Sequence, residues 1–128
     1  KELRFILPVG EMLINGIIDC VVEKDSGLML VDYKTGRPPA ENEVHLGYAY
    51  QLAIYKYAVE KLLGKKAEEA KLHFLQNLSQ WNLPEDKDYL DEALALCKEI
   101  GSKGEEKDFA CNLASCAYCP YNYLCPQK

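Results

Sequence analysis

The chain lacks any long apolar run. No stretch reaches the roughly 18 to 20 residues that a membrane-spanning helix requires, and the start at Lys1 lacks a signal-peptide pattern. From these absences we expect a cytoplasmic location and no membrane partner. An initiator methionine is also missing, and residues 3–7 already have the character of a strand, which predicts a piece excised from a longer polypeptide.

An excess of positive charge is missing as well. The 20 acidic residues outnumber the 15 basic ones and give a net charge of -5. Because non-specific nucleic-acid affinity comes mainly from clustered lysine and arginine, this chain does not hold DNA by bulk electrostatics, and any strand that it cuts needs further help to stay bound. Histidine is scarce too. His45 and His73 have no partner at ligand spacing, so we assign them no chemistry.

The length allows one ordinary domain. A chain of 128 residues, 48% of them hydrophobic, can bury one packed core but not two. Four of the six cysteines crowd near the end, which indicates a metal site rather than disulfides. We therefore expect a core domain over residues 1–105 and a cysteine-rich tail over residues 106–128.

Two apolar segments predict a β-hairpin. Residues 13–22 and 28–34 are rich in branched apolar side chains, and residues 23–27 between them have turn chemistry. Side chains alternate along a strand, so Asp32 and Lys34 share one face.

The register of this hairpin decides whether two acids meet. If Glu23 pairs with Leu28, Asp19 falls opposite Asp32, with about 5 Å between their Cβ atoms. A slip of one residue turns Asp19 away. The functional interpretation therefore predicts an even-length loop or a compensating bulge.

The rest of the chain alternates predicted elements. We expect a loop over residues 35–46, a helix over 47–63 ended by Gly64, a strand over 70–78 whose first half is also compatible with helix, a loop around Trp81, and a second helix over 86–100. The apolar face of that second helix consists of Leu90, Ala93, Leu94, Cys97 and Ile100.

Acids on apolar strands indicate chemistry, because an unpaired buried charge costs several kcal/mol or more. Mg²⁺ prefers carboxylate oxygens, so we predict that Asp19 and Asp32 hold a divalent cation, with the Tyr33 carbonyl as a third ligand. Lys34, on the same face, would orient the attacking water or stabilise developing charge on a phosphoryl group. The pattern predicts metal-dependent phosphodiester hydrolysis.

Three motifs in a fixed order resemble those of the PD-(D/E)xK nucleases of the RecB type. GIID ending at Asp19 is similar to their first-acid strand, DYK from Asp32 to Lys34 to their D-x-K strand, and QLAIY from Gln51 to Tyr55 to their Q-x-x-x-Y helix. The resemblance implies a restriction-endonuclease-like α/β core, a central mixed sheet flanked by helices. It also implies Mg²⁺- or Mn²⁺-dependent cleavage of DNA, at single-stranded or duplex ends.

The same family supplies further expectations. Its members serve as the C-terminal nuclease of ATP-dependent helicase-nucleases in double-strand break repair and recombination, so helicase domains in the same or a partner chain are implied. They usually have an extra helix upstream of Asp19, whose Glu or His completes the metal site. Residues 1–12 do not match it, since Glu11 falls in a turn or strand start, so we expect the first helix to be lacking and the isolated chain to be an incomplete nuclease.

The cysteine tail resembles the iron-sulfur segment of many such nucleases. Cys116, Cys119 and Cys125 are similar to its three C-terminal cysteines, which commonly join one cysteine far upstream. Cys111 departs from that pattern and is either the fourth ligand or a bystander. We expect a 4Fe-4S cluster, although four thiolates also satisfy zinc.

Other interpretations stay open. A CRISPR-associated nuclease shares the core and the tail, but that branch more often has Glu where Asp32 stands. A non-catalytic DNA- or partner-binding module and a zinc-stabilised interaction domain are further alternatives. Gln51 and Tyr55 either steady the lysine loop, contact the DNA backbone or simply pack in the core.

Overall fold

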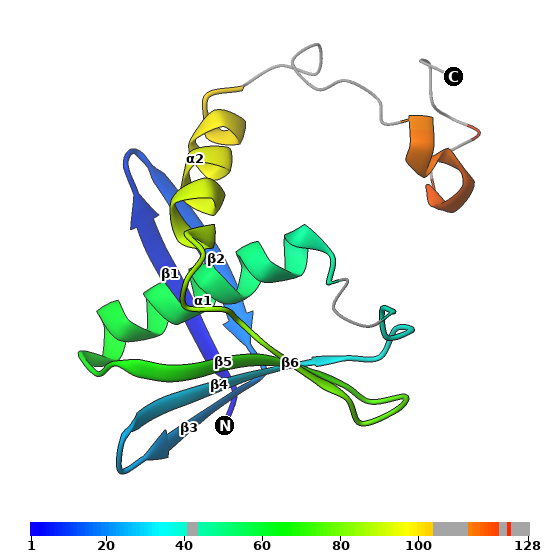
Figure 1. The fold of residues 1–128 in the computed structure, drawn as a ribbon. Helices are drawn as coiled ribbons and strands as arrows, with labels where there is room; N and C mark the ends of the chain where they lie inside the picture. The colour runs from blue at the N-terminus through cyan, green and yellow to red at the C-terminus, as the bar shows by residue number, and fades with distance from the viewer. Residues whose placement is uncertain (41–43, 104–112, 121–122, 124–128) are drawn as a thin grey trace.

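The computed structural model describes residues 1–40, 44–103, 113–120 and 123. Along the chain the elements are β1 (Leu3–Val9), β2 (Met12–Ile18), β3 (Cys20–Lys24), β4 (Gly27–Lys34), α1 (Leu46–Leu63), β5 (Ala67–Phe74), β6 (Gln80–Asn82), α2 (Tyr89–Gly101) and the 3₁₀ helix η2 (Leu113–Tyr118). β1 and β2 form a two-stranded ribbon, the other strands form a separate sheet, and α1 packs against both (Figure 1).

The four-stranded sheet is mixed, in the order β3-β4-β5-β6. β4 runs antiparallel to β3 and parallel to β5, and β6 closes the sheet antiparallel to β5. A parallel pair requires a long crossover, which α1 supplies between β4 and β5. The predicted α/β fold with a central mixed sheet flanked by helices is confirmed.

One apolar core joins the ribbon, α1 and the sheet. Its largest fully buried side chains are Ile18 of β2, Leu30 of β4, Leu52 and Val59 of α1, and Leu72 of β5. Burying each contributes about 1.5–3 kcal/mol. The core therefore fixes β4, which carries the predicted site, against α1.

The segment over residues 13–22 is not the single strand that was predicted. β2 ends at Ile18 and pairs with β1, whereas β3 begins at Cys20 and pairs with β4. Asp19 lies in the break between them. Branched apolar composition indicates strand conformation but not which partner each half selects, so the break was not visible. The β3–β4 hairpin itself is confirmed.

The later elements are shifted from their predicted bounds. The predicted strand over residues 70–78 runs instead from Ala67 to Phe74, without helix, and Trp81 lies in β6 rather than in a loop. A three-residue edge strand is too short to show a periodic pattern. α2 starts after Asp88, whose carboxylate accepts a hydrogen bond from the Asp91 N–H at 3.2 Å.

The expected inward face of α2 is only partly correct. Ala93 is buried and Leu90, Leu94 and Cys97 are half-buried, but Ile100 is 50% exposed because it lies in the last turn. No helix in the described part of the chain is both long and apolar enough to cross a bilayer.

Two glycines are required by the backbone. Gly64 ends α1 in the left-handed conformation (φ 63°), and its N–H donates to the Glu60 carbonyl at 3.0 Å, as its position after the helix predicted. Gly27 opens β4 at φ 149°, where a Cβ atom would lie 2.6 Å from the Lys66 carbonyl oxygen. Its missing side chain lets β4 begin close against the chain that leads into β5.

Candidate active site

The register of the β3–β4 hairpin brings Asp19 level with Asp32. Glu23 pairs with Leu28, as predicted, and the strands are joined by an even, two-residue turn. Continuing this register past the end of β3 puts the two acids opposite each other. Asp19 is held there by its own side chain, because its Oδ2 accepts a hydrogen bond from the Tyr33 N–H at 2.9 Å.

Among the described residues, Asp32 is the charged side chain that the fold buries, at 4% exposure. Burial raises its pKa, the hydrogen bond and charge of Lys34 oppose that rise, and the negative charge of Asp19 adds to it. Lys34 Nζ lies 2.6 Å from Asp32 Oδ2. Two carboxylates that disfavour each other's charge form a site that a bound cation would stabilise.

Lys34 is the first member of a chain of contacts that ends on α1. Its Nζ donates to Gln51 Oε1 at 2.8 Å, and Gln51 Nε2 donates to the Tyr55 hydroxyl oxygen at 3.0 Å. Burial is the main cause that raises the pKa of Tyr55, so the hydroxyl stays protonated. The structure therefore joins the three residues predicted from the D-x-K strand and the Q-x-x-x-Y helix.

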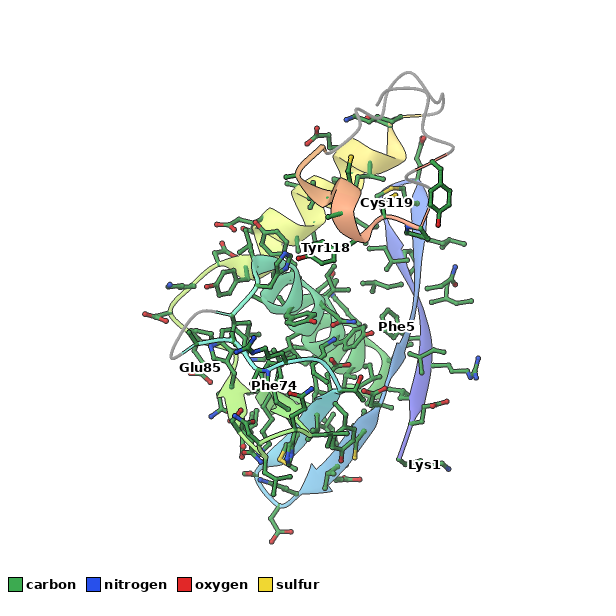
Figure 2. All side chains as sticks on the ribbon, turned by 90° about the vertical axis from the view of Figure 1, so that its right-hand side faces the viewer. Lys1, Phe5, Phe74, Glu85, Tyr118 and Cys119 are labelled. Carbon is green, nitrogen blue, oxygen red and sulfur yellow. The ribbon has the colours of Figure 1, made fainter. Side chains whose placement is uncertain are left out.

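The β1–β2 ribbon packs against Tyr55, the last residue in this series of contacts. The Phe5 ring meets the Tyr55 ring edge-on, with centroids 5.7 Å apart and planes at 81°. Phe5 lies on the face of the ribbon that is turned toward α1 (Figure 2). A Cβ atom at Gly16 would lie only 2.3 Å from Phe5 Cζ, so the glycine makes room for the ring.

Sequence reasoning missed Tyr48. Its ring lies beside the ammonium of Lys34, with Nζ 4.2 Å from the ring centroid. Tyr48 precedes Gln51 by three residues on α1, so both side chains lie on one helix face. That spacing was the available signal. His45, to which we assigned no chemistry, has a structural role, since its Nδ1 accepts a hydrogen bond from the Gly47 N–H at the start of α1.

The donor set fits a hard divalent cation. Asp19 and Asp32 offer carboxylate oxygens from two adjacent chain segments, and such oxygens are the ligands that Mg²⁺ and Mn²⁺ prefer. Among the described residues, no group of three or more His, Cys, Asp and Glu side chains gathers in one place. A carbonyl such as that of Tyr33 therefore remains the predicted third protein ligand.

The cysteine tail is described only in part. Cys111 and Cys125 lie outside the described residues. Cys116 and Cys119 are half-buried free thiols in and just after η2, and the Cys119 N–H donates to the Cys116 carbonyl at 3.3 Å. The predicted cluster ligands and the division into two segments stay predictions.

Lysines near the sheet are paired with glutamates. Lys24 contacts Glu69 at 2.9 Å, Lys71 contacts Glu69 at 3.6 Å, and Lys65 pairs with Glu23. These pairs neutralise charge that would otherwise attract phosphates. Weak binding of DNA by bulk electrostatics, expected from the net charge, stays a prediction.

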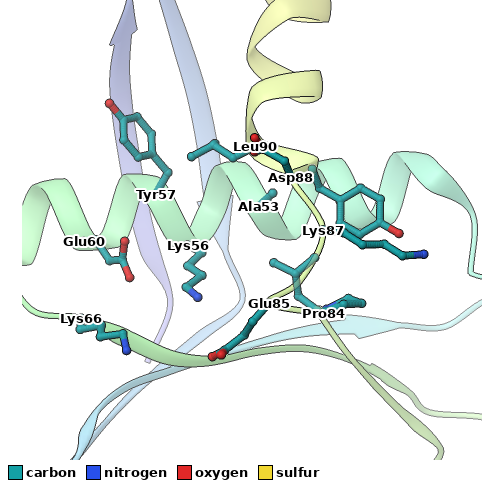
Figure 3. Close-up of a pocket in the computed structure, with 12 residues that line it drawn as sticks. Ala53, Lys56, Tyr57, Glu60, Lys66, Pro84, Glu85, Lys87, Asp88 and Leu90 are labelled. Carbon is teal, nitrogen blue, oxygen red and sulfur yellow. The ribbon is translucent and has the colours of Figure 1, made fainter.

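A separate cavity of about 280 Å³ lies between α1 and the segment leading into α2 (Figure 3). Its α1 side chains include Ala53, Tyr57 and Glu60, which are on the opposite side of the helix from Gln51 and Tyr55 at 100° per residue. Lysines and acids both line it. The cavity shares no residue with the Asp32–Lys34 site.

Two relatives have similar sequences. The chain is 41% identical over 71 residues to an ATP-dependent helicase/nuclease subunit of Pelotomaculum thermopropionicum, covering 54% of this chain and 6% of that protein. It is 42% identical over 67 residues to the corresponding subunit of Moorella thermoacetica, covering 52% of this chain and 5% of that protein. The chain thus spans only about a twentieth of the length of these relatives.

A solved structure and a family model also match the chain. The crystal structure of SSO0001 superposes with a TM-score of 0.63 at 19% identity, covering 98% of this chain and 58% of that one, which shows a shared fold. The model of the PD-(D/E)XK nuclease superfamily matches residues 1–126. The chain therefore belongs to the PD-(D/E)XK nuclease superfamily.

Proposed function

We propose that this chain is a metal-dependent deoxyribonuclease domain that hydrolyses phosphodiester bonds. The observation that carries the proposal is the convergence of Asp19, Asp32 and Lys34 at one point, with the lysine 2.6 Å from a buried carboxylate. A structural ion pair alone would not need a second acid level with the first. Two acids and a lysine supply what phosphodiester hydrolysis needs, namely cation ligands and a positive point charge.

Each residue has a distinct part. Asp19, Asp32 and the Tyr33 carbonyl would hold Mg²⁺ or Mn²⁺, which supplies charge neutralisation and a more acidic water when bound. Lys34 orients the attacking water or stabilises the charge that develops on the phosphoryl oxygens. Gln51 holds Lys34 through its amide oxygen, and Tyr55 fixes the orientation of that amide.

The setting that we propose is the nuclease of an ATP-dependent helicase-nuclease, acting in double-strand break repair and recombination. The names of the two relatives, which are ATP-dependent helicase/nuclease subunits, support the helicase-nuclease part of this proposal. Helicase domains in the same or a partner chain would deliver DNA, as single strands or duplex ends. This arrangement also fits the paired lysines, because the strand would then be held by another part of the machine.

We further propose that Cys111, Cys116, Cys119 and Cys125 bind a 4Fe-4S cluster. The number of thiols and the spacing of Cys116 and Cys119 support this set. Anaerobic purification followed by iron, sulfide and zinc analysis tests it, with Cys20→Ser as a control outside the set. Zinc without iron would select the zinc-stabilised alternative.

The nuclease proposal is tested with the chain joined to its native upstream segment, which is expected to supply the remaining metal ligand, by incubation with linear single-stranded DNA and Mn²⁺. We expect wild type to cut the strand and Lys34→Ala to cut it at least about 100-fold more slowly. Lys24→Ala should keep the wild-type rate, because Lys24 pairs with Glu69, away from Asp19 and Asp32. If wild-type protein binds the strand without cutting it, the chain is a binding module instead.

A further inference from the structure

The ammonium of Lys34 has three identifiable neighbours. Asp32 Oδ2 lies 2.6 Å away, Gln51 Oε1 lies 2.8 Å away, and the centroid of the Tyr48 ring lies 4.2 Å away. The Lys34 side chain is only 17% exposed, so water is largely replaced by these groups. An ammonium has three N–H donors; one of them is used by Gln51, and the Asp32 carboxylate lies within ion-pair distance.

The aromatic neighbour is a favourable one. A cation within about 6 Å of a ring centroid is attracted by the negative face of the ring, and the attraction is larger where water is excluded. Tyr48 and Gln51 are three residues apart on one face of α1, so a single helix presents both to the lysine. The His45 ring packs against Tyr48 at 5.9 Å, and His45 also caps the start of this helix.

The two kinds of neighbour differ in what else they must do. Asp32 would be shared between Lys34 and the cation that the site is proposed to bind, so its attraction for the lysine would weaken when the cation is bound. Gln51 and Tyr48 are not predicted cation ligands and do not face this competition. They can hold Lys34 in place whether or not a cation is bound to Asp32.

From this geometry we propose that Tyr48 is a positioning residue, whose ring holds the charged Lys34 side chain where it can act on the phosphate. The inference rests on the proposed nuclease function. The ring, not the hydroxyl, is the acting group. Tyr48→Phe should therefore still hold the Lys34 side chain in place. Tyr48→Leu retains apolar bulk but has no π face, so it should not.

Kinetics of DNA cleavage with Mn²⁺, measured on the chain joined to its native upstream segment, give the first test. We expect Tyr48→Leu to lower kcat by about 2- to 30-fold with KM nearly unchanged, the rate equivalent of one cation–π contact, and Tyr48→Phe to retain the wild-type kcat. Tyr50→Leu is the matched control, because Tyr50 is also half-buried on α1 but contacts Tyr89 and Glu92 instead. A wild-type kcat in Tyr48→Leu, or an equal loss in Tyr48→Phe, would overturn the proposal.

A second readout does not depend on cleavage. A ring over the lysine shifts the Lys34 εCH₂ protons upfield in NMR spectra, and the resonance is assigned by its absence in Lys34→Ala. We expect the shift in wild type and Tyr48→Phe and its loss in Tyr48→Leu. An unshifted wild-type resonance, or a shift kept in Tyr48→Leu, refutes the contact. If wild type shows the shift but cuts no DNA, the nuclease proposal fails while the hold of Tyr48 on Lys34 stands.

Discussion

Asp19, which lies between β2 and β3, accepts a hydrogen bond at its Oδ2 from the backbone N–H of Tyr33 in β4, at 2.9 Å. This bond ties the first acid of the site to the strand that carries the second. It also distinguishes two properties of Asp19, since the hydrogen bond requires only an acceptor, whereas cation binding requires the negative charge.

Asp19→Asn separates these properties. The amide oxygen still accepts the Tyr33 N–H, but the charge is lost. We expect Mn²⁺ to raise the melting temperature of wild type by several degrees, since a ligand at 100 times its Kd adds about 2.7 kcal/mol, and to leave Asp19→Asn nearly unchanged. Differential scanning fluorimetry with and without chelator measures both.

Asp19→Ala completes the comparison. It removes the hydrogen bond as well, so its melting temperature should fall below that of Asp19→Asn even in chelator, by the equivalent of about 0.5–1.5 kcal/mol. A wild-type response of Asp19→Asn to Mn²⁺ would remove Asp19 from the proposed cation site.

The Lys34–Gln51–Tyr55 chain predicts graded kinetic losses. Gln51→Leu removes a hydrogen bond to a charged group, worth about 1.5–3 kcal/mol, so kcat should fall about 10- to 150-fold. Tyr55→Phe removes only a neutral bond to Gln51 and should cost about 2- to 10-fold. A larger loss in Tyr55→Phe than in Gln51→Leu would contradict the order in which these residues act.

The raised pKa of Asp32 predicts how stability varies with pH. Because the native carboxyl binds its proton more tightly than in the unfolded chain, where its pKa is near the ordinary 3.8, the native state loses stability as pH rises from that value through the raised pKa. Asp32→Asn has no such charge. Its stability relative to wild type, from urea unfolding in chelator, should therefore increase with pH over this window and level off above it.

The opposite trend is equally measurable. If the stability of wild type increases relative to that of Asp32→Asn as pH rises, the attraction of Lys34 for the Asp32 carboxylate exceeds the cost of burying its charge. The ion pair would then stabilise the fold by itself, which would argue against a cation site. Cleavage by Asp32→Asn should be lost in either case, since the cation ligand is gone.

Gly16→Ala tests the contact between the ribbon and α1. The new Cβ would overlap the Phe5 ring, so we expect a loss of about 1–3 kcal/mol in chemical denaturation. Gly36→Ala is the control, because nothing lies within 4 Å of its Cβ position. Adding Phe5→Leu to Gly16→Ala should restore part of the lost stability. If Gly16→Ala has the stability of wild type, the Phe5 ring moves aside without cost.

Much of the site could be predicted because its signals are local. The two-residue periodicity of β4 aligned Asp32 with Lys34, and the turn fixed the Glu23–Leu28 register. The change of partner at Asp19 was not predictable, since both halves of the segment have the same apolar composition. Tyr48 was missed for a related reason, because an aromatic side chain on a helix usually indicates core packing, and only the fold shows that a lysine from a distant strand lies against it.

The pairing of Lys24, Lys65 and Lys71 with glutamates has a kinetic consequence. Because these three lysines are engaged by acids of the chain itself, they add little to the retention of a cut strand, so we expect distributive cleavage, with release after each hydrolysis and little dependence on salt. If the domain works within a helicase-nuclease, as we propose, processive degradation would be a property of the helicase, and the rate of translocation would set the length of the products.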